Sequence, residues 1–152
     1  MNGILKKVLA TDMDVTPTIL RIVLGCVIFA HGVQKLFGIW GGHGPTWTVE
    51  AWKQWWGVPS FLTYTVIGIE SFGAVLLILG LLTRIWAFLI GAVMLVAVYL
   101  VHLHWGFYMN WYMQPQTGEG FEYHILVLSI VVVLMVKGGG RWSVDGLLHQ
   151  KL

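Results

Sequence analysis

The fold of this chain is decided by the stretch PTILRIVLGCVIFAHGVQKLF, residues 17–37, which is apolar over most of its length. About 20 helical residues cross a hydrocarbon core of ~30 Å, so this stretch predicts a membrane-spanning helix. Thr16 is its predicted N-cap, and Pro17 suits the first helical position, where its missing N–H costs nothing. The whole chain agrees, because 57% of its 152 residues are hydrophobic, only 11% are charged and the mean hydropathy is +0.77.

Three further apolar segments of spanning length follow, at about residues 59–79, 84–103 and 119–137. Gly80 is suited to end the first of these as its C-cap, and the next segment begins so soon that the two helices must be antiparallel neighbours. We therefore predict an all-α protein, an integral membrane antiparallel four-helix bundle, with residues 1–152 as a single domain.

Charge and cysteine content exclude several classes of function. A net charge of +2 at pH 7, scattered along the chain, is too small to indicate a nucleic-acid partner. Cys26 is the only cysteine, so the sequence excludes an internal disulfide, a CxxC redox pair and two-cysteine thiol oxidation. Fe–S cysteines and a nucleotide-binding glycine pattern are also missing, so the sequence shows no electron carrier of its own.

The two long connections, residues 38–58 and 104–120, are rich in aromatic residues. They contain seven of the nine tryptophans, namely Trp40, Trp47, Trp52, Trp55, Trp56, Trp105 and Trp111. Tryptophan concentrates at membrane–water interfaces, so we expect two aromatic loops that fold back as a cap on the bundle. Most basic residues lie at the opposite ends of the spans, at Lys6, Lys7, Arg84, Lys137, Arg141 and Lys151. The positive-inside rule then places both termini in the cytoplasm and both loops outside.

Polar residues gather in the outer half of the predicted bundle. His31, Gln34 and Lys35 are spaced i, i+3, i+4 and share one face of the first helix. Glu70 falls near the bilayer midplane, where a charged and unpaired carboxylate is costly, so we favour a functional role for it. The third and fourth helices add, near the same end, Tyr99, His102, Glu119, Glu122, Tyr123 and His124. This pattern predicts an outward-facing polar pocket that binds a polar head group and relays protons.

These polar and aromatic residues also have structural readings. Lys35 suits snorkelling to the headgroups, and the tryptophans suit interface anchoring. Arg21 and Arg84, near the cytoplasmic edge, suit structural or topological anchoring better than catalysis. His102 and His104 are about 200° apart on a helix, so only one of them can face inward.

An ordered set of motifs resembles the DoxX family. The motifs are Arg21, AHGVQKLFG (30–38), GIESFGAVLLILGLLTR (68–84), VHLHWGF (101–107), EYHILVL (122–128) and GGGRWSVD (138–145). One departure is Gly139, where the family often has proline. The resemblance implies a four-helix membrane protein tied to redox chemistry, since known members include a subunit of thiosulfate:quinone oxidoreductase and a membrane organiser of a radical-detoxification complex. The family's characteristic polar positions correspond to Arg21, His31, Lys35, Glu70 and Arg84.

The residues and the resemblance together predict a quinone-linked redox subunit of a respiratory chain in the prokaryotic cytoplasmic (inner) membrane. It would accept electrons from an extracytoplasmic donor, such as a reduced sulfur compound, through a partner protein. The predicted catalytic residues are Glu70, His31 and Lys35. The predicted cofactor-binding residues are Arg21, Gln34, Tyr99, His102, Trp105 and Glu122, and no metal site is predicted. Quinone is the expected cofactor, and a haem held by His31 and His102 is a less favoured alternative.

Two other functions remain open at this point. The chain would instead be a non-catalytic anchor or assembly subunit of a larger redox complex, with its aromatic loops as the docking surface. A transporter is disfavoured, because four helices without an evident inverted repeat would need to oligomerise. Membrane lipid is an expected partner, and Gly25, Gly32, Gly68 and Gly73 allow close helix contacts within or between subunits, including those of a homo-oligomer.

Overall fold

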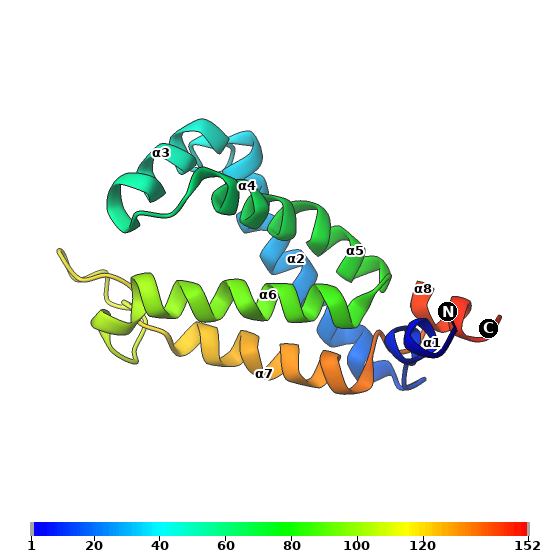
Figure 1. The fold of residues 1–152 in the computed structure, drawn as a ribbon. Helices are drawn as coiled ribbons and strands as arrows, with labels where there is room; N and C mark the ends of the chain where they lie inside the picture. The colour runs from blue at the N-terminus through cyan, green and yellow to red at the C-terminus, as the bar shows by residue number, and fades with distance from the viewer. Residues whose placement is uncertain (1, 152) are drawn as a thin grey trace.

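The computed structural model describes residues 2–151, and every regular element among them is helical (Figure 1). The elements in chain order are α1 Asn2–Leu9, α2 Val15–Phe37, α3 Gly44–Trp56, α4 Ser60–Gly68, the π-helix η1 Ile69–Gly73, α5 Ala74–Leu79, α6 Thr83–Ala97, the π-helix η2 Val98–His102, the 3₁₀-helix η3 Leu103–Trp105, α7 Glu122–Lys137 and α8 Val144–His149. The all-α prediction is therefore confirmed.

Three continuous helices are long and apolar enough to cross a membrane: Val15–Phe37, Ser60–Leu79 and Thr83–Trp105. The second joins α4, η1 and α5, and the third joins α6, η2 and η3. They correspond to the predicted spans 17–37, 59–79 and 84–103. The fourth predicted span, 119–137, is shorter in the structure, because α7 begins at Glu122 and has 16 residues.

The long helices enclose an apolar core. α2 packs against α5, η1 and α7, while α6 packs against α7, α5 and η1. The core between them is built from fully buried side chains, among them Leu24, Ile28, Leu77, Ile90 and Leu134. Large apolar side chains also point outward along the same helices, including Ile19, Val23, Phe72, Phe88 and Leu126. Helices that are apolar on both faces are expected where the surrounding solvent is lipid.

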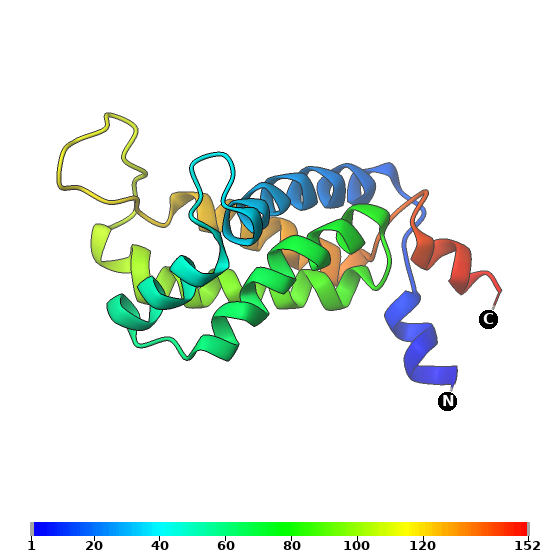
Figure 2. The ribbon, with the colours of Figure 1, turned by 90° about the horizontal axis from the view of Figure 1, so that it is seen from above.

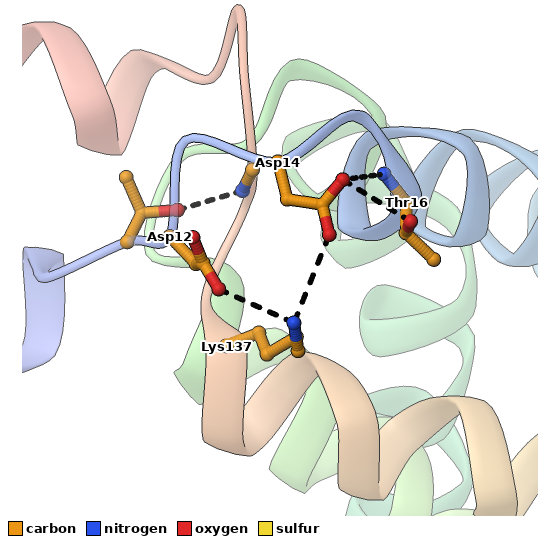
Figure 3. Close-up of polar contacts among 6 residues, drawn as sticks. Asp12, Asp14, Thr16 and Lys137 are labelled. Carbon is orange, nitrogen blue, oxygen red and sulfur yellow. Dashed lines mark hydrogen bonds and ion pairs between the residues drawn. The ribbon is translucent and has the colours of Figure 1, made fainter.

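The start of α2 is tied to the end of α7 by charged side chains (Figure 3). The α2 N-cap is Asp14, whose carboxylate accepts from the Thr16 backbone N–H at 3.0 Å, so the prediction of Thr16 as N-cap was wrong. Either residue type can cap a helix, and here the acidic one lies just upstream. Lys137 Nζ lies 3.2 Å from Asp12 Oδ2 and 3.7 Å from Asp14 Oδ2.

The chain termini meet at one end of the molecule, where Arg21 and Asp145 hold the backbone together. Arg21 is buried and donates to the carbonyl oxygens of Ile78, Gly139 and Trp142. Asp145 accepts from Leu82 N at 2.6 Å and from Thr83 N at 2.8 Å, so it caps the start of α6 from 62 residues further along the chain. The GGGRWSVD motif therefore has a structural role, because it binds Arg21 of α2 and caps the start of α6. We call this set of contacts the clasp.

The other end of the molecule carries the two long connections (Figures 1 and 2). The first was predicted to be a loop, and the structure corrects this: residues 44–56 form α3, which is closed by Gly57 in the left-handed conformation. The second, residues 106–121, contains no regular helix. Both lie away from the two chain termini, as the positions of α3 and of the yellow loop show.

Candidate functional site

The predicted catalytic residues Lys35 and Glu70 form an ion pair inside the molecule. Lys35 Nζ lies 2.5 Å from Glu70 Oε2, and the two side chains are only 21% and 6% exposed. Lys35 Nζ also lies 5.9 Å from the ring centroid of Trp52, within reach of a cation–π contact. Lys35 therefore turns inward to its partner instead of snorkelling away from it. A carboxylate buried among apolar helices needs such a partner.

Local backbone structure brings Glu70 to this position. Glu70 lies in η1, and single π-helical turns inside α-helices are frequent at functional sites. η1 packs closely on α2, because a Cβ at Gly32 would stand 2.4 Å from the Glu70 carbonyl oxygen. Gly32 thus lets η1, which carries Glu70, approach α2, which carries Lys35.

The ion pair lines a cavity of about 810 Å³. Most of the wall is apolar, and part of it comes from α4 and α6, which diverge toward α3 in Figure 1. Trp52 and Trp56 of α3 also line it. Its polar lining residues are His31, Lys35, Thr65, Glu70, His102, Glu119, Tyr123 and His124. Ligand sites commonly have this character, a mainly apolar cavity of ~300–1,000 Å³ with a few placed polar groups.

A second polar cluster on the cavity wall consists of His102, Tyr123 and His124. The rings of His102 and His124 are in contact, with centroids 4.2 Å apart and planes tilted by 44°. His102 Nδ1 lies 2.8 Å from the carbonyl oxygen of Glu119, which can only accept, so this nitrogen carries the proton. Within the described part of the chain, the Tyr123 hydroxyl and His124 Nδ1 are buried without a hydrogen-bond partner.

Four of the nine predicted site residues line this cavity: Glu70, His31, Lys35 and His102. The structure also answers the question of the two histidines. His102 lines the cavity, whereas His104 stacks on Trp105, with ring centroids 4.6 Å apart.

The other five predicted site residues are not among the residues that line the cavity. Gln34 donates to the Trp40 carbonyl at 2.9 Å, and Glu122 accepts from Met109 N and Trp111 Nε1. Gln34 therefore holds the first long connection, and Glu122 holds the second. Tyr99 is 75% exposed on η2.

Trp105 and Arg21 are held elsewhere by their own contacts. A Cβ on Gly118 would stand 2.5 Å from Trp105, so this indole packs on the second long connection. Arg21 lies at the clasp near the chain termini and not at the cavity. That position agrees with the anchoring role considered for Arg21 from the sequence.

Several cavity residues were not predicted as site residues. Tyr123, His124 and Glu119 had been noted as polar residues at the start of the fourth helix but were given no role. Tyr123 and His124 stand next to each other in EYHILVL, directly before an apolar run, and this pattern is the sequence feature that could have indicated a site here. Trp52 and Trp56 were assigned to a loop, and only the helical spacing of α3 places both on the cavity wall.

No group of three or more His, Cys, Asp or Glu side chains is placed to hold a metal ion within residues 2–151. His31 and His102 both line the cavity, and haem ligation by this pair stays a prediction.

Comparison with known proteins identifies the family. The DoxX family model matches residues 16–103. A Bacillus subtilis (strain 168) protein named "Putative oxidoreductase CatD" is 31% identical over 123 residues, which cover 81% of each chain. The "Inner membrane protein YqjF" of Escherichia coli (strain K12) is 25% identical over 138 residues, covering 91% of this chain and 95% of its own. No solved structure matches. The family model and the first relative show that this membrane protein belongs to the DoxX family.

Proposed function

We propose that the chain is a quinone-linked redox subunit of the prokaryotic cytoplasmic membrane. The observation that carries this proposal is the Lys35–Glu70 ion pair on the wall of a mainly apolar cavity of about 810 Å³. Such a cavity suits a flat, lipophilic ring with polar substituents, because apolar walls hold the ring and a few polar groups orient it. A bound quinone supplies two-electron, two-proton redox chemistry.

The residues of the cavity fit a quinone head group. The Lys35 ammonium has donors left beyond its bond to Glu70, and one of them can bind a carbonyl oxygen. Glu70 keeps that ammonium paired and in place. His31 lines the same cavity and can carry a proton at an imidazole nitrogen. Trp52 and Trp56 offer flat apolar surfaces for ring packing and help exclude water.

The proposal includes the topology of the chain in the membrane. It crosses the membrane four times as a four-helix bundle, with α7 as the fourth crossing, both termini in the cytoplasm and α3 outside. The distribution of lysine and arginine supports this orientation. Electrons come from an extracytoplasmic donor, such as a reduced sulfur compound, delivered by a partner protein.

The names of the two relatives support the redox and location parts of the proposal. The Bacillus protein is named as an oxidoreductase, and the Escherichia protein is named as an inner membrane protein. Both alignments cover most of each chain.

A second candidate is a non-catalytic anchor or assembly subunit that acts as a homo-oligomer in a larger redox complex. The observation in its favour is the exposed aromatic surface of the second long connection, formed by Tyr108, Trp111, Tyr112 and Met113. Exposed apolar patches of this kind mark interaction sites. In this case the Lys35–Glu70 pair would only hold helices together.

The deciding experiment is to purify the tagged full chain in mild detergent and to quantify quinone in its lipid extract. Wild type is compared with Glu70→Gln and with Glu50→Gln, which makes the same change on the exposed face of α3. Near-stoichiometric quinone in wild type and Glu50→Gln, lost in Glu70→Gln, supports the proposal. Wild type without quinone above the lipid background contradicts it and favours the anchor.

A further inference from the structure

The second polar cluster contains buried atoms that the fold itself does not satisfy. Tyr123 OH and His124 Nδ1 have no hydrogen-bond partner among residues 2–151, and His124 is only 5% exposed. Buried polar groups are nearly always paired, because leaving one unpaired costs free energy. Both residues are among those that line the cavity.

The cluster lies across the cavity from the Lys35–Glu70 pair. Glu70 belongs to η1, whereas Tyr123 and His124 belong to the first turn of α7. α2 and α6 each pack against both η1 and α7, so η1 and α7 face each other across the space that α2 and α6 enclose. The cavity thus has polar groups from η1 and from α7, and most of its other lining residues are apolar.

The imidazole of His124 is held in position from the outer side. It packs against the tilted ring of His102 at 4.2 Å between centroids, and His102 is fixed by its Nδ1–H donating to the Glu119 carbonyl. Tyr123 packs edge-on against the same imidazole, with centroids 5.5 Å apart. A group held in this way is preorganised for a ligand, which lowers the entropy cost of binding.

We propose that Tyr123 and His124 form a second hydrogen-bonding wall, which receives the far polar end of a ring ligand whose near end is held by Lys35. The ligand class is a flat ring with acceptors at opposite ends, as in a 1,4-dione. This inference rests on the proposed function and adds to it the selectivity of the cavity for a ligand with two opposed acceptors. A ring with one carbonyl leaves one wall unsatisfied and binds more weakly.

The test compares two ring ligands that differ in the number of carbonyl groups. 2-Methyl-1,4-naphthoquinone carries two opposed carbonyls, and 1-tetralone carries one. Each is titrated by isothermal calorimetry into the full chain in mild detergent. The variants are Tyr123→Phe, which removes only the hydroxyl, and Tyr64→Phe, which makes the same change at an exposed position on α4.

For wild type we expect the dione to bind more tightly than the mono-ketone. Tyr123→Phe should weaken the dione about 5-fold, the effect of one hydrogen bond, and leave the mono-ketone within about 2-fold. Tyr64→Phe should change neither affinity. Equal weakening of both ligands, or no weakening of the dione, would overturn the inference.

A second variant pair keeps the test decisive if Tyr123→Phe does not fold. His124→Phe removes the ring nitrogens, whereas His124→Asn keeps a polar atom near the place of Nδ1. We expect His124→Phe to lose the preference for the dione and His124→Asn to retain part of it. Wild type that binds the dione no better than the mono-ketone refutes the inference alone. Wild type that binds neither ligand refutes the proposed function and this inference with it.

Discussion

Gly32 lies so close to Glu70 that a Cβ on the glycine would stand 2.4 Å from the Glu70 carbonyl oxygen. This contact sets the distance between α2 and η1, and therefore the distance between Lys35 and its carboxylate partner. Position 32 is thus a structural determinant of the ion pair, although it carries no side chain.

Gly32→Ala should destabilise the protein by about 1–3 kcal/mol, because the added methyl has to push η1 away from α2. Thermal unfolding in detergent measures the loss, and retained ligand is measured on the same samples. Gly68→Ala is the matched control, since a Cβ there meets nothing within 4 Å. Equal melting temperatures for Gly32→Ala and wild type would show that η1 is not constrained by this contact.

The Lys35–Glu70 pair should show strong energetic coupling. Glu70→Gln and Lys35→Met each leave a partner poorly compensated, so the double variant should cost about 1–3 kcal/mol less than the sum of the singles. The exposed pair of Lys137 and Asp12 serves as the comparison, and its expected coupling free energy is about 0–1 kcal/mol. If the losses of stability in the two single variants simply add up in the double variant, Lys35 and Glu70 are not coupled, which would contradict the proposed site.

Arg21→Lys should lower stability without lowering ligand occupancy. Lysine lacks the planar fork that lets Arg21 serve the carbonyls of Ile78, Gly139 and Trp142 together, and the expected loss is about 1–3 kcal/mol. The readout is quinone per folded protein after removal of aggregates. A fall in that ratio would restore Arg21 to the cofactor-binding residues predicted from the sequence.

Asp14 should make part of the stability depend on acid pH. The Thr16 backbone N–H bonded to its carboxylate lowers the pKa of Asp14 below the ordinary 3.8, and Lys137 acts in the same direction. A depressed folded-state pKa gives stability that is present above the unfolded pKa and lost as pH falls through the folded value. Wild type should therefore be more stable than Asp14→Asn at pH 6, and the difference should shrink as the pH falls below the ordinary pKa of 3.8. Melting curves across this range check it, and a difference independent of pH would contradict it.

Hydropathy predicted three of the long helices well, because runs of about 20 apolar residues have few alternatives to a membrane helix. Hydropathy did not indicate α3, because the tryptophans in GPTWTVEAWKQWW are also typical of an interface loop. The features that indicate a helix here are the proline near its start and the glycine at its end. The start of the fourth helix was placed too early, because the residues before Glu122 are held by contacts to the second long connection, such as Phe121 N to the Gly106 carbonyl.

The site was predicted only in part, because helical spacing assumes a regular α-helix. Tyr99 and His102 were both predicted to bind the cofactor, but both lie in η2, whose π-helical turn holds more residues than an α-turn. His102 consequently lines the cavity while Tyr99 points away from it. Sequence spacing also failed for Gln34, which shares a helix face with Lys35 but is taken up by the Trp40 carbonyl.

The cap that Asp145 places on α6 has a consequence for how the protein is made. Leu82 and Thr83 are synthesised long before Asp145, so their backbone N–H groups have no cap while the second and third long helices are inserted. The clasp with Arg21 also waits for Gly139 and Trp142. Capping of the start of α6 is therefore a late step, which takes place only after residues 138–145 have been synthesised.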